Sequence, residues 1–236
     1  MFRPREKRRR LRIAPPALRA RSQARRARHP LIRALGDADQ AVLRVLRTRG
    51  HQPPVELAMR GLGTIGEYGA VWATIGAAGA TADPARRRRW AIAALAGPAA
   101  LAVNYAAKIA IGRERPLIEG HPPLARAPSK LSFPSAHATS SLTGATALGR
   151  VEPRARAPLY ALAVAICASR PYLGMHYPSD VLAGAALGAL LGRLVPGVRD
   201  RDTEERLIDL VNQSHGAMAG GNGALCSHPP AGRPAA

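Results

Sequence analysis

The chain has 236 residues, of which 35 are Lys or Arg and 15 are Asp or Glu, so its formal net charge is +20. An apolar content of 47% excludes a wholly disordered chain, and two cysteines exclude a disulfide scaffold and a Cys-rich zinc module. The length suits one domain with tails, and the charge indicates an anionic partner, either nucleic acid or phospholipid headgroups.

The positive charge is concentrated at the N-terminus. Residues 1–60 hold 17 of the 35 basic residues and 4 of the 15 acids, a net charge of +13. We interpret residues 1–36 as a basic disordered arm that can bind an anionic membrane surface. The arm lacks interleaved aromatic residues for stacking on single strands and has no DNA-reading motif, so nucleic acid is not favoured as its partner.

Residues 37–60 form the next region, and its first part has helical periodicity. The apolar residues that recur at this spacing, with arginines beside them, are Ala41, Val42, Val45 and Leu46. This pattern predicts an amphipathic interfacial helix, which lies either on a membrane or against the rest of the protein.

Five apolar stretches follow, and with their flanks they predict five membrane helices, at 62–82, 90–112, 134–150, 157–171 and 179–196. We therefore expect an all-α fold, a membrane helical bundle of about five transmembrane helices, in a multi-pass protein of the cell membrane. The membrane domain covers 61–196, and 197–236 form a polar, mostly disordered tail with a short helix near 203–212. A soluble bundle with Ala-rich core helices is the alternative. Basic residues flank both ends of the spans, so the positive-inside rule does not decide the orientation.

Two glycine patterns stand out in this region. The last stretch carries a double G-x-x-x-G, formed by Gly184, Gly188 and Gly192. In lipid such small residues allow two helix backbones to approach closely. The dinucleotide-binding pattern G-x-G-x-x-G is formed by Gly61, Gly63 and Gly66. No strand is predicted before it, as that fold would need, so we interpret these glycines as helix-packing residues.

Polar residues that a membrane helix should avoid cluster at two helix ends. Lys108 and Arg115 are seven residues apart, so both can project from one helix face, where an anion between them would relieve their repulsion. Pro134 predicts the start of the next helix. There the Ser135 hydroxyl, the free N–H groups and the helix dipole make an anion site, and His137 can exchange a proton.

A third cluster supplies the cation Arg170, the turn residue His176 and the helix-opening Asp180. Asp180 can hold one imidazole nitrogen and leave the other nucleophilic. Three cations, two histidines and one carboxylate suit phosphoryl transfer without a metal. Metal binding is the rival use of His and Asp, but a site amid three cations is poor for a dication. Glu67 either approaches this site or caps a helix.

These motifs resemble those of the type 2 phosphatidic acid phosphatase superfamily over residues 60–196. All three family motifs occur in order, as K-x6-R-P at Lys108–Pro116, P-S-x-H at Pro134–His137 and S-R-x5-H-x3-D at Ser169–Asp180. Ala136 stands where the family usually has glycine, which keeps the backbone N–H.

The resemblance implies a role for each motif residue and no cofactor. His176 is the expected nucleophile, which forms a phosphohistidine and is oriented by Asp180, and His137 is the expected general acid. The phosphoryl group is expected to bind Lys108, Arg115, Ser135, Arg170 and the Ala136 N–H.

The resemblance also implies a lipid phosphate as substrate. The compact length and the stretch Gly66–Trp72 are similar to bacterial members that act on polyprenyl-linked lipids, one of which removes the 5-phosphate from a decaprenylphosphoryl phosphoribose. Undecaprenyl pyrophosphate and phosphatidylglycerol phosphate remain alternatives. A vanadate-dependent haloperoxidase is a further alternative within the superfold, but those relatives are soluble and larger. The oligomeric state is not predicted.

Overall fold

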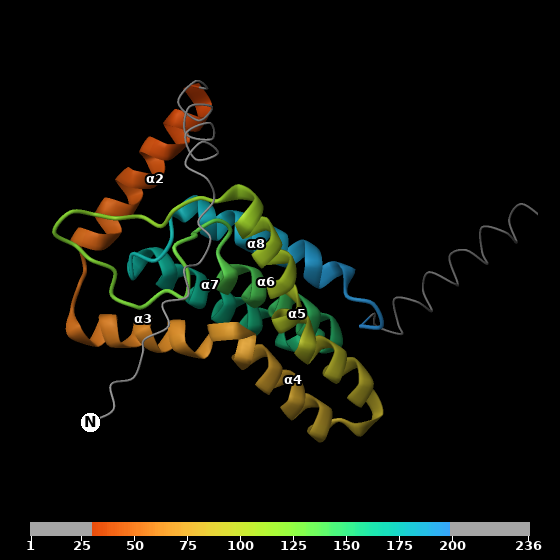
Figure 1. Cartoon of the computed structure of the whole chain (residues 1–236). Coiled ribbons are helices and arrows are strands. Elements are labelled where there is room, and N and C mark those ends of the chain that lie inside the picture. Colours follow the sequence, from red (N-terminus) through yellow and green to blue (C-terminus); the bar gives the residue numbers. More distant parts are fainter. Residues whose placement is uncertain (1–29, 199–236) are drawn as a thin grey trace, which may run out of the picture.

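The computed structural model describes residues 30–198, and these form a bundle of helices joined by loops (Figure 1). The main helices are α2 (Pro30–Thr48), α3 (Pro53–Ile65), α4 (Ala70–Ala82), α5 (Arg87–Ile111), α6 (Ala136–Val151), α7 (Arg156–Tyr172) and α8 (Pro178–Leu194). Within the described range there is no β-strand, so the prediction of a mostly helical fold is confirmed. The basic arm as far as residue 29 and the expected tail helix at 203–212 lie outside the described residues.

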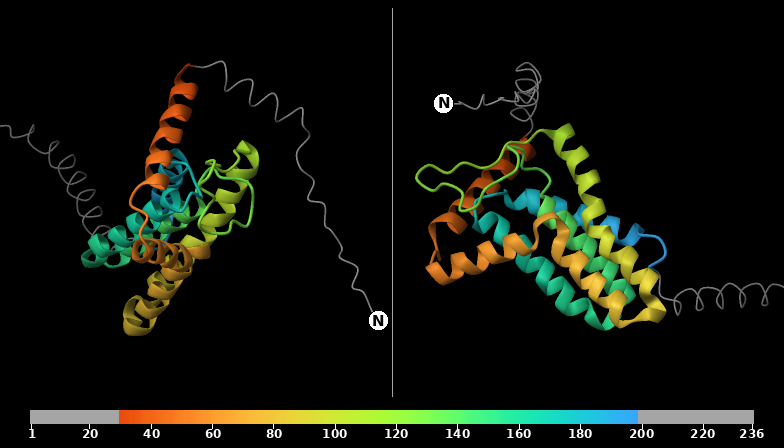
Figure 2. Two further views of the ribbon diagram at one scale, coloured as in Figure 1. Left: turned by 90° about the vertical axis from the view of Figure 1, so that its left-hand side faces the viewer. Right: turned by 60° about the horizontal axis from the view of Figure 1, so that its bottom comes forward.

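Helix α6 is the centre of the bundle. Every residue from Ala138 to Gly149 is buried, and α6 packs against α5, α7 and α8 (Figures 1 and 2). Its sequence is rich in Ala, Ser, Thr and Gly, and these small residues allow neighbouring helices to approach on all sides. The start of α6 is therefore enclosed by the ends of other helices. His137 of the second motif lies there.

The glycines of α8 provide the closest of these approaches. A Cβ atom at Gly184 would lie 2.6 Å from the carbonyl oxygen of Ser135, and one at Gly192 would lie 2.6 Å from Cβ of Thr146. Thr143 also donates a hydrogen bond across the interface to the carbonyl of Gly188, at 3.1 Å. The prediction that this double G-x-x-x-G mediates close helix packing is confirmed.

The helix expected at 62–82 is divided in two. Between α3 and α4 the chain turns through η1 (Glu67–Gly69), where Tyr68 has φ 54° and Gly69 has φ 76°. A Cβ at Gly69 would lie 3.1 Å from the backbone nitrogen of Pro98 in α5, so glycine is needed for both the conformation and the close approach. Periodicity alone missed this break, because the residues on both sides of it are apolar.

Two helix starts also differ from the prediction. The amphipathic helix begins at Pro30 rather than at Asp37, so residues 30–36 are helical and not part of a disordered arm. Helix α6 begins at Ala136 rather than at Pro134, because the Ser135 hydroxyl accepts a hydrogen bond from the Ala138 N–H and caps the helix.

Helix α2 packs one face against the bundle and leaves the other exposed. Leu43 is fully buried, and the guanidinium of Arg47 donates to the carbonyls of Tyr172, at 3.2 Å, and Pro122, at 2.7 Å. Val42 and Val45 on the other face are about half exposed. The loop between α5 and α6 passes beside this helix (Figure 2), so α2 borders the region in which the motifs meet.

One helix in the described part of the chain is long and apolar enough to cross a membrane, the continuous segment Pro84–Ile111. Helices α6, α7 and α8 have 16, 17 and 17 residues, slightly short of a bilayer span on their own. The structure therefore establishes one candidate span, and the number five continues to rest on the sequence.

Candidate active site

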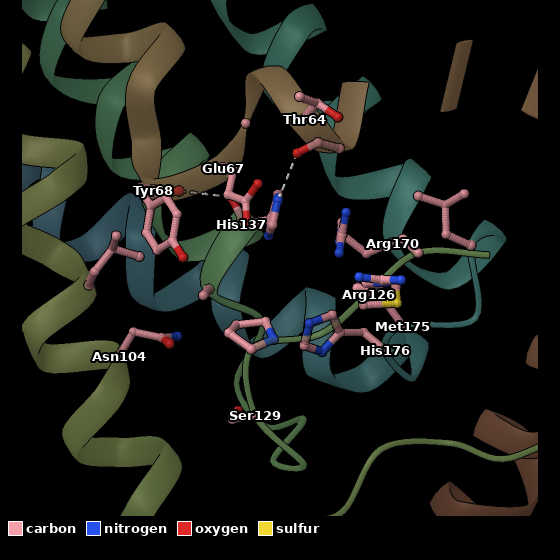
Figure 3. Close-up of a pocket in the computed structure, with 18 of the residues that line it drawn as sticks. Thr64, Glu67, Tyr68, Asn104, Arg126, Ser129, His137, Arg170, Met175 and His176 are labelled. Atoms are coloured by element: carbon pink, nitrogen blue, oxygen red, sulfur yellow. Dashed lines mark hydrogen bonds between the residues drawn. The ribbon is translucent and has the colours of Figure 1, made fainter. Parts of the chain in front are cut away.

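A cavity of about 810 Å³ opens where α3, the α5–α6 loop, the start of α6 and the end of α7 meet. Six of the eight predicted site residues line it, namely Lys108, Arg115, Ala136, His137, Arg170 and His176. The other two, Ser135 and Asp180, are fully buried behind its wall. Figure 3 shows His137, Arg170 and His176 directed toward the same space.

His176 lies in the turn before α8 and is 2% exposed. Its Nε2 atom is 3.2 Å from Nη1 of Arg115. An arginine only donates, so Nε2 is the unprotonated nitrogen and the proton is on Nδ1. Burial, reinforced by the charges of Arg115 and Arg170 and opposed by Asp180, lowers the pKa of His176 to about 3. The ring is therefore neutral at pH 7, with its Nε2 lone pair on the cavity side.

Asp180 lies behind the His176 ring at the first turn of α8. Its Oδ2 atom is 3.6 Å from Nδ1 of His176, slightly beyond hydrogen-bond length, and this Nδ1 has no other partner. The same Oδ2 accepts a hydrogen bond from the Tyr177 N–H at 3.0 Å. The carboxylate thus faces the protonated ring nitrogen, in the position needed to orient the ring.

His137 lies in the first turn of α6, on the opposite side of the cavity from His176. Its Nε2–H donates to the carbonyl oxygen of Gly63 at 2.9 Å, drawn in Figure 3 as the dashed line that ends on the His137 ring. This contact fixes the ring against α3 and leaves Nδ1 for proton exchange. Gly66 also approaches the ring, since a Cβ there would lie 3.3 Å from Cδ2 of His137. Two of the three glycines of the false dinucleotide pattern, Gly63 and Gly66, therefore make room for site residues, Arg170 and His137 respectively.

The three motif cations are held in different ways. Arg170 is buried, and its Nε has no hydrogen-bond partner, so part of the guanidinium is unsatisfied without an anion. Arg115 donates to the carbonyls of Ser129, at 2.9 Å, and Met175, at 2.7 Å, as well as facing His176. The ammonium of Lys108 donates to the carbonyls of Leu131, Ser132 and Pro134, at 3.0–3.2 Å, and so holds the loop that enters α6.

Several residues of this region were not predicted from the sequence. Asn104 lies one turn before Lys108 in α5, lines the cavity and donates to Thr139 Oγ1 at 2.9 Å. A buried amide within an apolar span is a signal that could have identified it. Arg113, between the two cations of the first motif, binds Asp180 directly. Glu67, whose role the sequence left open, lines the cavity with Tyr68.

The charge of the wall favours an anion. Its described lining contains five basic residues, the three motif cations together with Arg60 and Arg126, and one acid, Glu67. Such a surplus attracts a phosphate and opposes a divalent cation. The fold and the cavity thus define a helical protein with a positively charged cavity that two histidines line.

Comparison with known proteins agrees with this class. The family model "PAP2 superfamily" matches residues 89–204. Decaprenylphosphoryl-5-phosphoribose phosphatase of Mycobacterium tuberculosis is 41% identical over 154 residues, which cover 62% of this chain and 82% of that protein. The protein of the same name from Mycolicibacterium smegmatis is 40% identical over 150 residues, which cover 62% and 80%.

A solved structure is also similar. The transmembrane PAP2-type phosphatidylglycerolphosphate phosphatase of Bacillus subtilis superposes with a TM-score of 0.59 at 26% identity, over 77% of this chain and 93% of that one. The chain belongs to the PAP2 superfamily, and the family resemblance inferred from its three motifs is confirmed.

Proposed function

We propose that this protein, a lipid phosphatase of the PAP2 superfamily, removes a phosphate monoester from a polyprenyl-linked membrane lipid through a phosphohistidine intermediate. The observation that carries the proposal is the neutral His176, whose Nε2 lone pair faces a cavity lined by Arg115 and Arg170. A buried, unprotonated imidazole directed at an anion site is placed for attack on phosphorus.

In the first step, Nε2 of His176 attacks the phosphorus atom while the bond from phosphorus to the lipid oxygen breaks. His137, as the imidazolium in the substrate complex, gives its Nδ1 proton to that leaving oxygen while Nε2–H stays bonded to Gly63. Arg115, Arg170 and the N–H groups at the start of α6 neutralise the equatorial oxygens, whose charge is greatest in the transition state. The ammonium charge of Lys108 also favours the anion, while its hydrogen bonds hold the loop that leads into α6. Asp180 stabilises the positive charge on the phosphorylated ring.

In the second step, water attacks the phosphorus of the phosphohistidine and the phosphorus–nitrogen bond breaks. His137 takes the proton that the water loses, which returns the enzyme to its starting state and releases inorganic phosphate. The same two histidines therefore serve both steps, and the reaction balances without a metal or an added cofactor.

The surface supports a multi-pass membrane location with about five spans. Large apolar side chains that are about half exposed or more lie on the outer faces of several helices, namely Leu95, Val103 and Ile109 on α5, Val164 on α7, and Leu182 and Leu190 on α8. A protein in water rarely exposes so many on neighbouring helices, whereas lipid covers them at no cost.

The choice of substrate rests on the similarity to the mycobacterial phosphatases and on the size of the cavity. A volume of about 810 Å³ is far more than one phosphate needs, so it also accommodates a sugar or glycerol group beside the reacting phosphate. Arg60 and Arg126 also line the cavity, beyond the three motif cations. They can bind a second anionic group of the lipid.

The experiment is a phosphate-release assay with the full chain in detergent, in the presence of EDTA. The panel contains decaprenylphosphoryl 5-phosphoribose, undecaprenyl pyrophosphate and phosphatidylglycerol phosphate. We expect the first to be turned over fastest, and His176→Ala to lose both turnover and acid-labile labelling from substrate carrying ³²P. Full turnover by His176→Ala would contradict the assigned nucleophile, and a preference for another lipid would contradict the substrate.

A further inference from the structure

The carboxylate of Asp180 is held by a network of side chains that reaches helix α2. Nη1 of Arg113 donates to Oδ1 of Asp180 at 2.8 Å, and Nη2 of the same guanidinium donates to Oδ2 of Asp39 at 2.8 Å. Arg113 belongs to the loop after α5, Asp180 to α8 and Asp39 to α2. One planar group therefore joins three segments that are distant in the sequence.

The network is buried and has several anchors. The side chains of Asp180, Asp39 and Arg113 are 0%, 7% and 18% exposed. Asp39 also accepts from the Ser179 N–H at 2.9 Å and contacts the Ser179 hydroxyl, and Arg113 lies 4.0 Å above the ring of Tyr177. Charge-assisted hydrogen bonds in a buried setting are strong and directional, so this guanidinium has little freedom to turn.

The geometry of Asp180 follows from that restraint. Arg113 occupies its Oδ1, and the Tyr177 N–H occupies one lone pair of Oδ2, which leaves the rest of Oδ2 for Nδ1 of His176. Without Asp39, Arg113 would be free to turn both of its terminal nitrogens toward Asp180. The carboxylate would then rotate away from the plane that faces His176.

We propose that Asp39 and Arg113 are positioning residues for the reaction, through which helix α2 sets the orientation of Asp180 and thereby of the nucleophile. This inference rests on the proposed function, in which Asp180 orients His176. Asp39 lies outside the region 89–204 that matches the family model, so the motif residues alone do not reveal it.

The test uses the full chain in detergent with the lipid that the wild type turns over. The variants are Asp39→Asn, Asp39→Glu, Arg113→Gln and the double variant Asp39→Asn/Arg113→Gln. Asp37→Asn, an exposed residue of the same helix, is the matched control. Each variant is characterised by kcat, KM, the inhibition constant of inorganic phosphate and the thermal unfolding midpoint. Wild type and His176→Ala are measured alongside, and they alone decide whether the proposed function holds.

We expect Asp39→Asn to lower kcat by about ten- to a hundredfold, as for a displacement of roughly 1 Å at the reacting group. KM and the phosphate inhibition constant should stay within about twofold, because the cations that bind the anion are untouched. Asp39→Glu should recover part of the loss. The double variant should be only slightly slower than Arg113→Gln, since Asp39 acts mainly through Arg113 and otherwise only through its contacts with Ser179.

Three results would overturn the inference. The first is a kcat of Asp39→Asn equal to that of Asp37→Asn. The second is independent, multiplicative effects of the two substitutions in the double variant. The third is weaker phosphate binding in proportion to the loss of kcat, which would mean general loosening of the site. If Asp39→Asn does not fold, the charge-preserving Asp39→Glu provides the same comparison with a smaller expected loss.

Discussion

Gly63 gives Arg170 the room it needs to reach the anion site, so Gly63→Ala should impair catalysis without unfolding the protein. A Cβ at this position would lie 2.7 Å from Nη1 of Arg170, and ordinary contacts begin near 3.4 Å. The guanidinium must therefore retreat by about 0.7 Å. Because a displacement of 1 Å costs about a hundredfold, we expect turnover to fall on the order of 10- to 100-fold.

Gly61→Ala is the matched control. Gly61 lies in the same helix, and an added Cβ there would have nothing within 4 Å. Both substitutions gain about 0.5–1 kcal/mol of helix stability from the loss of glycine flexibility. The displaced atom in Gly63→Ala is the end of a flexible side chain, so its thermal unfolding midpoint should stay near that of wild type.

The assay is phosphate release in detergent, together with inhibition by inorganic phosphate and thermal unfolding of both variants. We expect Gly63→Ala alone to lose turnover and to bind phosphate more weakly, because the proposed mechanism has Arg170 contact the anion in both the ground state and the transition state. Equal turnover by Gly63→Ala and Gly61→Ala would refute the reasoning, since it would mean that the position of Arg170 does not limit the reaction.

Three further predictions test other parts of the structure. His137→Ala should slow hydrolysis of alkyl phosphates far more than that of aryl phosphates, because good leaving groups need no acid; equal losses would contradict its role. The folded-state pKa of His176, about 3, lies below the unfolded value of 6.5, so the stability it contributes is lost as pH falls between these values. Thermal unfolding across that range should show a steeper pH dependence for wild type than for His176→Gln. Gly192→Ala should destabilise the bundle by about 1–3 kcal/mol, because its Cβ would lie 2.6 Å from Cβ of Thr146; an unchanged unfolding midpoint would argue against close packing of α6 and α8.

The motif residues could be predicted from the sequence because each carries its chemistry in its residue type and spacing. Lys108, Arg115, His137, Arg170 and His176 are costly in hydrocarbon, so their recurrence at helix ends is enough to indicate a common site. Their convergence on one cavity could also be predicted from the sequence. In a bundle of helices with alternating direction, every second connection lies at the same end of the bundle. The small residues of α8 predicted close packing for a similarly local reason.

Other features depended on contacts that no local pattern encodes. The break at Tyr68 and Gly69 is set by the approach of α5, and the earlier start of α2 lies in a region whose charge suggested disorder.

What the sequence by itself determined is the set of groups available for the proposed reaction, because side-chain identity fixes which protons and charges are present. What only the tertiary structure decided is how those groups are supported. Asp39 and Arg113 are separated by the second half of α2 and by α3, α4 and α5, and a buried ion pair between them forms only when packing removes both from water. The same holds for Gly63. Its lack of a side chain matters only because the folded chain brings the Arg170 guanidinium against it.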